Sequence, residues 1–197
     1  MTRQPTKSSL DDFAASGAAL AIAFAWGLAE ATVFFIVPDV LLTLIACRAL
    51  RPALKATVAA LAGALAGGAL MYVFGLREPH TARVLLDHIP AISPDLITRV
   101  AQQVSEGGLM AVLLGPIKGI PYKIYAAEWG ARGGSFVGFL LISIPARCVR
   151  FALAAFAARG IARLVEPLTH HQAAIETLIL TIIWAAFYAL YFSRFGS

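Results

Sequence analysis

The stretch ATVAALAGALAGGALMYVFGL, residues 56–76, decides the class of fold, because it runs for 21 residues without a charged side chain. A helix needs about 20 mostly apolar residues to cross the hydrocarbon core of a bilayer. Residues 173–192 form a second apolar stretch with one charge, Glu176, and residues 135–158 form a third that contains Arg147 and Arg150. We therefore expect an all-α integral membrane protein with three or more spanning helices.

The composition excludes most soluble classes of protein. The chain has 197 residues, of which 59% are apolar and 14% charged, and its mean hydropathy is +0.78. Soluble domains average about 45–50% apolar and about 25% charged residues. A net charge of +5 in so apolar a chain indicates orientation in a membrane rather than a nucleic-acid partner. We expect a single membrane domain over residues 1–197, beginning with a polar segment at 1–12.

Two further apolar stretches are interrupted by proline. Residues 13–50 are broken around Pro38, and residues 107–128 are broken at Pro116 and again at Pro121. Proline removes a backbone donor from a helix, and unpaired backbone is not tolerated against lipid. We expect two re-entrant hairpins, each made of a helix, a break and a second helix. Two ordinary kinked helices are the alternative.

The order of these segments repeats. Each broken segment precedes a spanning helix, at 56–76 and at 135–158, and the helix at 173–192 closes the chain. Paired broken segments at corresponding positions are typical of transporters, whose binding site lies where the two halves meet. Glycines four apart, as at Gly63 and Gly67, indicate close helix packing, either within the chain or between copies in a homo-oligomer.

A polar connector, residues 77–106, separates the two halves. Ser93, Pro94 and Asp95 provide an N-cap, a proline at the first helical position and an acid in the first turn. We expect a short amphipathic helix here, lying at the membrane interface.

Lysine and arginine bias predicts the orientation. If the first broken segment returns to its own side, most basic residues outside the connector share one face: Arg3, Lys7, Arg48, Arg51, Lys55, Arg159 and Arg163. The N-terminus is then cytoplasmic, and the two hairpins enter from opposite faces of an inner membrane. A cleaved signal peptide is disfavoured because the apolar run after the first basic residues is long and resumes past the A-x-A site at residues 29–31.

Charged side chains flank both breaks. Glu30 and Asp39 lie beside the first, where we expect them to exchange a proton or to balance cations. Lys118 and Lys123 flank Pro121 in the second break, and they are expected to bind an anionic head group together with Arg147 and Arg150 of the following helix. Alternatively, Glu30 is solvated at a helix end. In that case the lysines extend to the membrane interface, and the arginines only follow the positive-inside rule. The sequence contains no nucleophile, metal-ligand or cofactor motif, so we expect no enzyme activity and no cofactor.

Three motifs, in this order, resemble the DedA superfamily, also called the VTT or SNARE-associated domain, and most closely its short YqaA-like branch. They are EATVFFIVPDVLL at residues 30–42, GIPYKIYAAEWG at 119–130 and RCVRF at 147–151. The helix between them, GGALMYVFG at 67–75, is also similar. The resemblance implies two opposed re-entrant hairpins and movement of phospholipid or polyprenyl phosphate between leaflets, in some members apparently coupled to protons.

We therefore expect a lipid translocase whose partners are membrane lipids and not nucleic acid. Two other functions fit the same sequence. One is a non-transporting protein that organises or assembles the membrane, and the other is a transporter of small ions or solutes.

Overall fold

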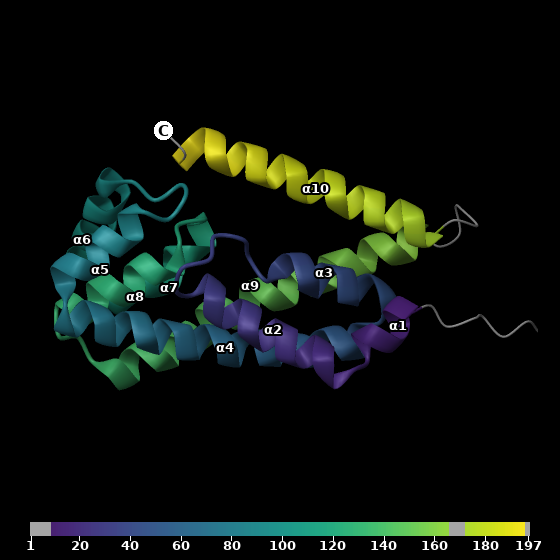
Figure 1. Ribbon diagram of the computed structural model, residues 1–197, viewed down its shortest axis with the longest axis horizontal. Helices are drawn as coiled ribbons and strands as arrows, with labels where there is room; N and C mark the ends of the chain where they lie inside the picture. The colour runs from purple at the N-terminus through teal and green to yellow at the C-terminus, as the bar shows by residue number, and fades with distance from the viewer. Residues whose placement is uncertain (1–8, 166–171, 196–197) are drawn as a thin grey trace, which may run out of the picture.

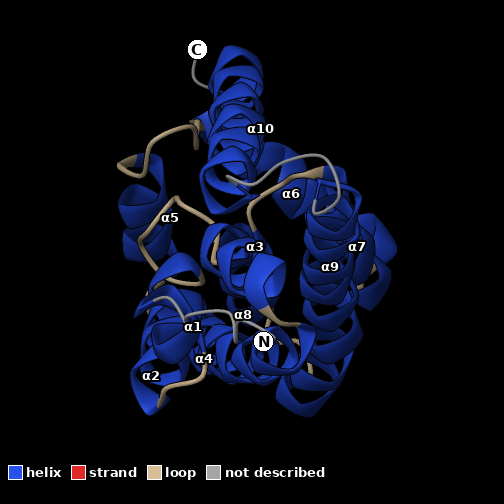
Figure 2. Ribbon diagram, turned by 90° about the vertical axis from the view of Figure 1, so that its right-hand side faces the viewer, coloured by secondary structure: helices blue, strands red, loops and turns tan. Residues whose placement is uncertain are grey.

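The structure is a computed structural model that describes residues 9–165 and 172–195, so part of the polar segment 1–12 lies outside it. Within these ranges every regular element is a helix (Figure 2). Their bounds are α1 Ser9–Ala14, α2 Gly17–Glu30, α3 Asp39–Arg48, α4 Leu50–Arg77, α5 Pro79–Asp87, α6 Pro94–Gly107, α7 Leu109–Leu114, the 3-10 turn η1 Pro116–Lys118, α8 Tyr122–Ala131, α9 Phe136–Val165 and α10 Gln172–Phe195.

Three of the described helices are long and apolar enough to cross a membrane: α4, α9 and α10. The 28 residues of α4 rise about 42 Å, which exceeds a hydrocarbon core of about 30 Å. The chain is therefore a multi-pass membrane protein. All three helices extend beyond their predicted stretches, because a helix continues into polar residues where an apolar run stops. In α9 the helix also continues through Pro145.

Both broken segments have the predicted order of helix, break and helix. The first break, residues 31–38, separates α2 from α3, and the second, residues 119–121, separates η1 from α8. The segment predicted at 13–50 begins inside α1, which the sequence pattern does not separate from α2.

Helix α4 packs against α2 through small residues (Figure 1). A side chain added at Gly63 would collide with the backbone carbonyl of Phe24, and one added at Gly27 would collide with Ala60. This close approach is what glycines at this spacing permit. The glycine pattern of residues 63 and 67 therefore serves a contact within the chain.

The same helix packs against α8 nearer its C-terminal end. A side chain at Gly75 would collide with the backbone of Ala127, and one at Gly130 would collide with the backbone of Tyr72. Tyr72 also donates a hydrogen bond to the carbonyl oxygen of Gly134. The spanning helix α4 therefore packs against one helix of each broken segment, α2 of the first and α8 of the second.

The two breaks meet at consecutive residues of α4. Gly67 lies against Ala31, the first residue after α2, and Gly68 lies against the ring of Tyr122, the first residue of α8. These glycines are the twelfth and thirteenth residues of the 21-residue uncharged stretch at 56–76. The breaks therefore meet at the middle of the helix that the sequence most clearly assigns to the membrane.

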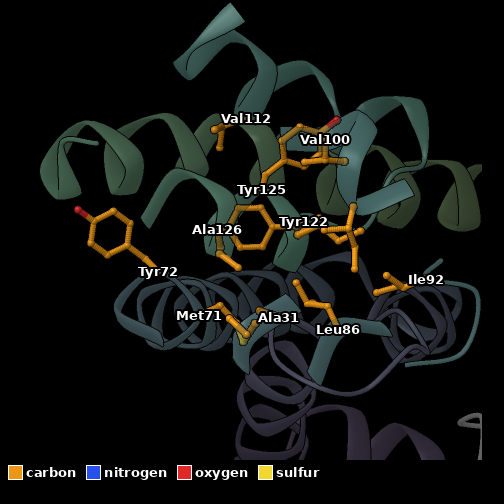
Figure 3. Close-up of a cluster of buried hydrophobic side chains, with 14 of the residues drawn as sticks. Ala31, Met71, Tyr72, Leu86, Ile92, Val100, Val112, Tyr122, Tyr125 and Ala126 are labelled. Carbon is orange, nitrogen blue, oxygen red and sulfur yellow. The ribbon is translucent and has the colours of Figure 1, made fainter. Parts of the chain in front are cut away.

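The connector folds into two helices, α5 and α6, rather than one. Ser93 caps α6 as predicted, since its side chain accepts a hydrogen bond from the N–H of Leu96. The apolar face of α6 is buried in protein, packed with Leu86 of α5 and Tyr125 of α8 (Figure 3). This face is consequently not free to lie on lipid, because α8 occupies it.

Candidate functional site

Three backbone polar groups of the first break are paired with side chains from other parts of the chain. The indole N–H of Trp26 donates to the carbonyl oxygen of Ile36 at 2.9 Å. The N–H of Val37 donates to the Tyr188 hydroxyl at 2.9 Å. The ammonium group of Lys123 donates to the carbonyl oxygen of Phe34 at 2.6 Å. Side chains from α2, α8 and α10 thereby replace the hydrogen bonds that Pro38 and the break remove, which makes the break tolerable away from water.

The second break depends on glycine and on tyrosine contacts. Gly119 has φ of +87°, a left-handed conformation that glycine adopts without steric cost. The ring of Tyr125 packs directly on Gly115, where a side chain would collide with it. The hydroxyl of Tyr122 donates to Ser143 of α9 at 2.8 Å. These contacts fix where α8 begins relative to α9.

Glu30 and Arg147 form an ion pair at the end of α2. Both side chains are buried, with Arg147 only 1% exposed. The guanidinium carbon lies 5.1 Å from the centre of the Tyr122 ring and 4.8 Å from that of Phe151, within the range of cation–π attraction. Two of its nitrogens, Nε and Nη1, make no hydrogen bond among the described residues.

Asp39 and Arg150 form a second ion pair at the start of α3. Their side-chain atoms are 2.7 Å apart, and the Asp39 side chain is 2% exposed while that of Arg150 is 26% exposed. The Oδ1 atom of Asp39 has no hydrogen-bond partner among the described residues. Arg150 is three residues after Arg147, so one helix presents both guanidinium groups to the first broken segment.

Five charged side chains gather between the breaks: Glu30, Asp39, Lys123, Arg147 and Arg150. Three are cations and two are carboxylates, so the cluster carries one net positive charge when all are ionised. Lys123 is the cation without a carboxylate partner in the described structure, and its ammonium has three donors for one carbonyl acceptor. A buried excess charge is costly without a counter-ion.

A cavity of about 450 Å³ lies beside this cluster. Its volume falls within the range of small-molecule sites, and its walls are mostly apolar, as such sites usually are. Four of the five clustered residues line it: Glu30, Asp39, Lys123 and Arg150. Both broken segments, α9, α10 and the loop between α5 and α6 contribute walls. The cavity thus joins elements that are far apart in the sequence.

The structure separates one predicted head-group residue from the others. Lys118 is exposed and does not line the cavity, because it ends the 3-10 turn before the chain reverses at Gly119. Pro116 and Pro121 line the cavity, whereas Pro38 is buried beside it. The lysines of the second break therefore have different environments, despite being five residues apart.

Aromatic residues of α10 form a wall that sequence reasoning missed. Trp184, Phe187, Tyr188 and Tyr191 line the cavity. Their spacing of three and four residues places them on one face of a helix, and this spacing was the available signal. Trp184 also donates to the hydroxyl of Thr43 at 3.1 Å, so α10 is tied to α3 as well as to the first break.

Glu128 was also missed. An acid beside a tryptophan is typical of a membrane interface, but here the carboxylate is 2% exposed and accepts two hydrogen bonds from Arg83 of α5, at 2.7 and 2.8 Å. This bidentate bond raises the pKa of the Arg83 guanidinium, which stays charged at physiological pH.

Comparison of the chain with protein-family models, with characterised proteins and with solved structures found no match.

Proposed function

We propose that this chain is a DedA-like protein of the inner membrane that moves a phosphate-bearing lipid between leaflets, with the lipid head group passing through the cavity between the two breaks. The observation that carries the proposal is an apolar cavity with a buried cluster of one net positive charge, at the level where both breaks meet α4. An anionic head group would neutralise that excess charge. The apolar walls suit the hydrocarbon that accompanies it.

The helix ends support an anion rather than a cation as cargo. Helices α3 and α8 both begin at the cavity, after Pro38 and Pro121, and neither first turn has a side-chain cap. Free backbone N–H groups at helix N-termini favour negative charge. In α3, Asp39 already offsets this effect, which leaves the start of α8, beside Lys123, as the better anion site.

The meeting of the breaks supports hairpins that enter from opposite faces. Helix α2 approaches the middle of α4 from one end, and α8 leaves that middle toward the other end (Figure 1). At the first end Arg159 donates to the carbonyl oxygen of Cys47, next to Arg48, so basic residues from α3 and α9 gather there. By the positive-inside rule this end is cytoplasmic, as is the N-terminus.

A structural role in partner binding has less support. The small-residue faces that would serve contacts between proteins are occupied by contacts within the chain, at Gly63 and Gly130 among others. No observation in the described ranges favours an ion over a lipid as cargo.

The test is reconstitution in liposomes that contain a lipid with a fluorescent head group. An impermeant quencher reports the lipid that reaches the outer leaflet. Wild-type protein should deplete the inner leaflet faster than protein-free vesicles do. Lys123→Gln should slow this by about tenfold, the effect of losing about 1.4 kcal/mol of binding to the head group in transit.

Lys118→Gln is the matched control, because it removes the same charge from the same segment outside the cavity. It should keep the wild-type rate. Wild-type protein that moves lipid no faster than empty vesicles would contradict the function. Equal slowing by both lysine variants would contradict the assigned site.

A further inference from the structure

The α5–α6 connector is tied to α8 by three polar contacts. Arg83 of α5 forms the bidentate ion pair with Glu128. Gln103 of α6 accepts a hydrogen bond from the Tyr125 hydroxyl, and Arg132 donates to the carbonyl oxygen of Ala101 at 2.6 Å. The connector is therefore docked on the helix that carries Lys123, rather than joined to it only through the chain.

The loop between α5 and α6 forms a wall of the cavity. Ile89, Pro90 and Ile92 line it, and both isoleucines are buried. Between them Ala91 has φ of +64°, and it is the one residue other than glycine with positive φ in the described ranges. Such a conformation is unusual for alanine, and it persists where surrounding contacts hold it, often at functional sites. Here the N–H of Ile92 donates to the carbonyl oxygen of Ile89 across Ala91, and both isoleucines are buried.

Helix α8 transmits the position of the connector to the cavity. Every residue from Tyr122 to Glu128 is buried, so this part of the helix is surrounded by other parts of the protein except where it faces the cavity. Its first turn lines the cavity, and the Glu128 carboxylate near its other end bonds to the connector. The Arg83–Glu128 ion pair therefore connects two elements that line the cavity. One is α8, through its first turn, and the other is the connector, through its 88–93 loop.

The exposure of this pair makes it suitable for opening and closing. The Glu128 side chain is 2% exposed, but the Arg83 side chain is 52% exposed. Water can replace Glu128 as the partner of Arg83, whereas the buried Glu128 carboxylate loses its counter-ion on release, which favours the closed arrangement. The other two pairs are less exposed, because both side chains are buried in the pair at Glu30 and the arginine is 26% exposed in the pair at Asp39.

We propose that the α5–α6 connector is a cap over the cavity, and that the Arg83–Glu128 ion pair is the latch that holds it shut. Arg83 and Glu128 are positioning residues, since they act on the cavity through the loop and through α8. When the latch is released, the 88–93 loop withdraws and the cavity opens toward the connector side. The cap controls access for any cargo, so it stands independently of lipid translocation.

Thiol labelling tests the cap directly. Ile92→Cys in a Cys148→Ala background places a thiol on the cap, in the cavity wall, and retains the buried native Cys47 as an internal control. An impermeant maleimide and peptide mass spectrometry give the labelling rate at each site. Arg83→Gln should raise labelling at residue 92 by about tenfold and leave Cys47 protected.

Arg99→Gln is the matched control, because Arg99 is an exposed arginine on the same connector. It should leave the labelling rate unchanged. Glu128→Gln should raise labelling as Arg83→Gln does, and the double variant should raise it no further, because both changes remove one interaction.

Three results would overturn the cap. One is unchanged labelling in Arg83→Gln, and another is an equal rise in Arg99→Gln. The third is loss of protection at Cys47, which would show that the pair maintains the whole fold rather than access. None of these measurements includes lipid transport, so failure of the cap and failure of the translocase are distinguishable.

Discussion

Glu30 and Arg147 are 117 residues apart in the sequence, yet they form an ion pair that is buried between the two broken segments. Glu30 ends α2 and Arg147 lies within α9, so the pair joins the first half of the chain to the second. The partner for each charge comes from the other half, and neither half could bury its charge alone.

Removing one member of this pair should be costly. Glu30→Leu leaves the Arg147 guanidinium buried without a counter-ion, and the expected loss is about 3–5 kcal/mol of unfolding free energy. The double variant Glu30→Leu with Arg147→Met should recover most of that loss, because it buries no charge. Thermal unfolding in detergent measures both. A double variant no more stable than Glu30→Leu would mean that the pair is not the source of the effect.

Lipid movement should depend on pH through Glu30 at acid pH, because the ion pair with Arg147 keeps the Glu30 carboxylate charged near neutrality. Protonation removes the negative charge of Glu30, weakens its ion pair and leaves the cluster more positive, which favours an anionic head group. Deprotonation restores the pair and favours release. Glu30→Gln keeps a hydrogen-bond acceptor for Arg147 but cannot exchange a proton, so its transport rate should vary less with pH. A wild-type pH profile in this variant would exclude Glu30 as the coupling group.

Two glycine substitutions should distinguish the effect of the close contact between α2 and α4 from the effect of helix propensity. Gly63→Ala forces a methyl group against the Phe24 carbonyl and should destabilise the protein by about 1–3 kcal/mol. Gly160→Ala in α9 meets nothing within 4 Å and should stabilise it by up to about 1 kcal/mol. Unfolding measured in the same detergent compares them. Equal effects would contradict the backbone contact between α2 and α4.

Tyr188→Phe should loosen the first break without disturbing its aromatic contacts. The variant loses the hydroxyl that accepts the Val37 N–H, an interaction worth about 1 kcal/mol. Amide hydrogen exchange should then be faster in the peptide covering residues 31–38. Exchange in the middle of α4 should not change, which distinguishes a local effect from general destabilisation. Unchanged exchange at the break would show that water satisfies Val37 in both proteins.

Opposed hairpins predict opposite labelling of exposed positions beside the two breaks. Val33 is 54% exposed and Ile117 is 58% exposed, so no other part of the described chain covers cysteines at these positions. In oriented vesicles an impermeant maleimide should label Val33→Cys from the cytoplasmic face and Ile117→Cys from the other. Labelling of both from one face would contradict the opposed arrangement.

The amino-acid sequence alone determines the long helices and the places where the others break. Residues 56–76 contain no charged side chain, and the prolines at 38, 116 and 121 each remove a backbone donor from helical hydrogen bonding. These are local properties, so the helix, break and helix order at both segments is predictable. The start of α6 at Ser93 is predictable for the same reason.

Tertiary structure decided which charges meet and which do not. Lys118 and Lys123 look equivalent in the sequence, but the chain reversal at Gly119 exposes the first and places the second in the cavity. Glu128 looks interfacial until α5 supplies Arg83. The partner of a buried charge is set by long-range packing, here by glycines that bring α2 and α8 to adjacent residues of α4, and no local pattern contains that information.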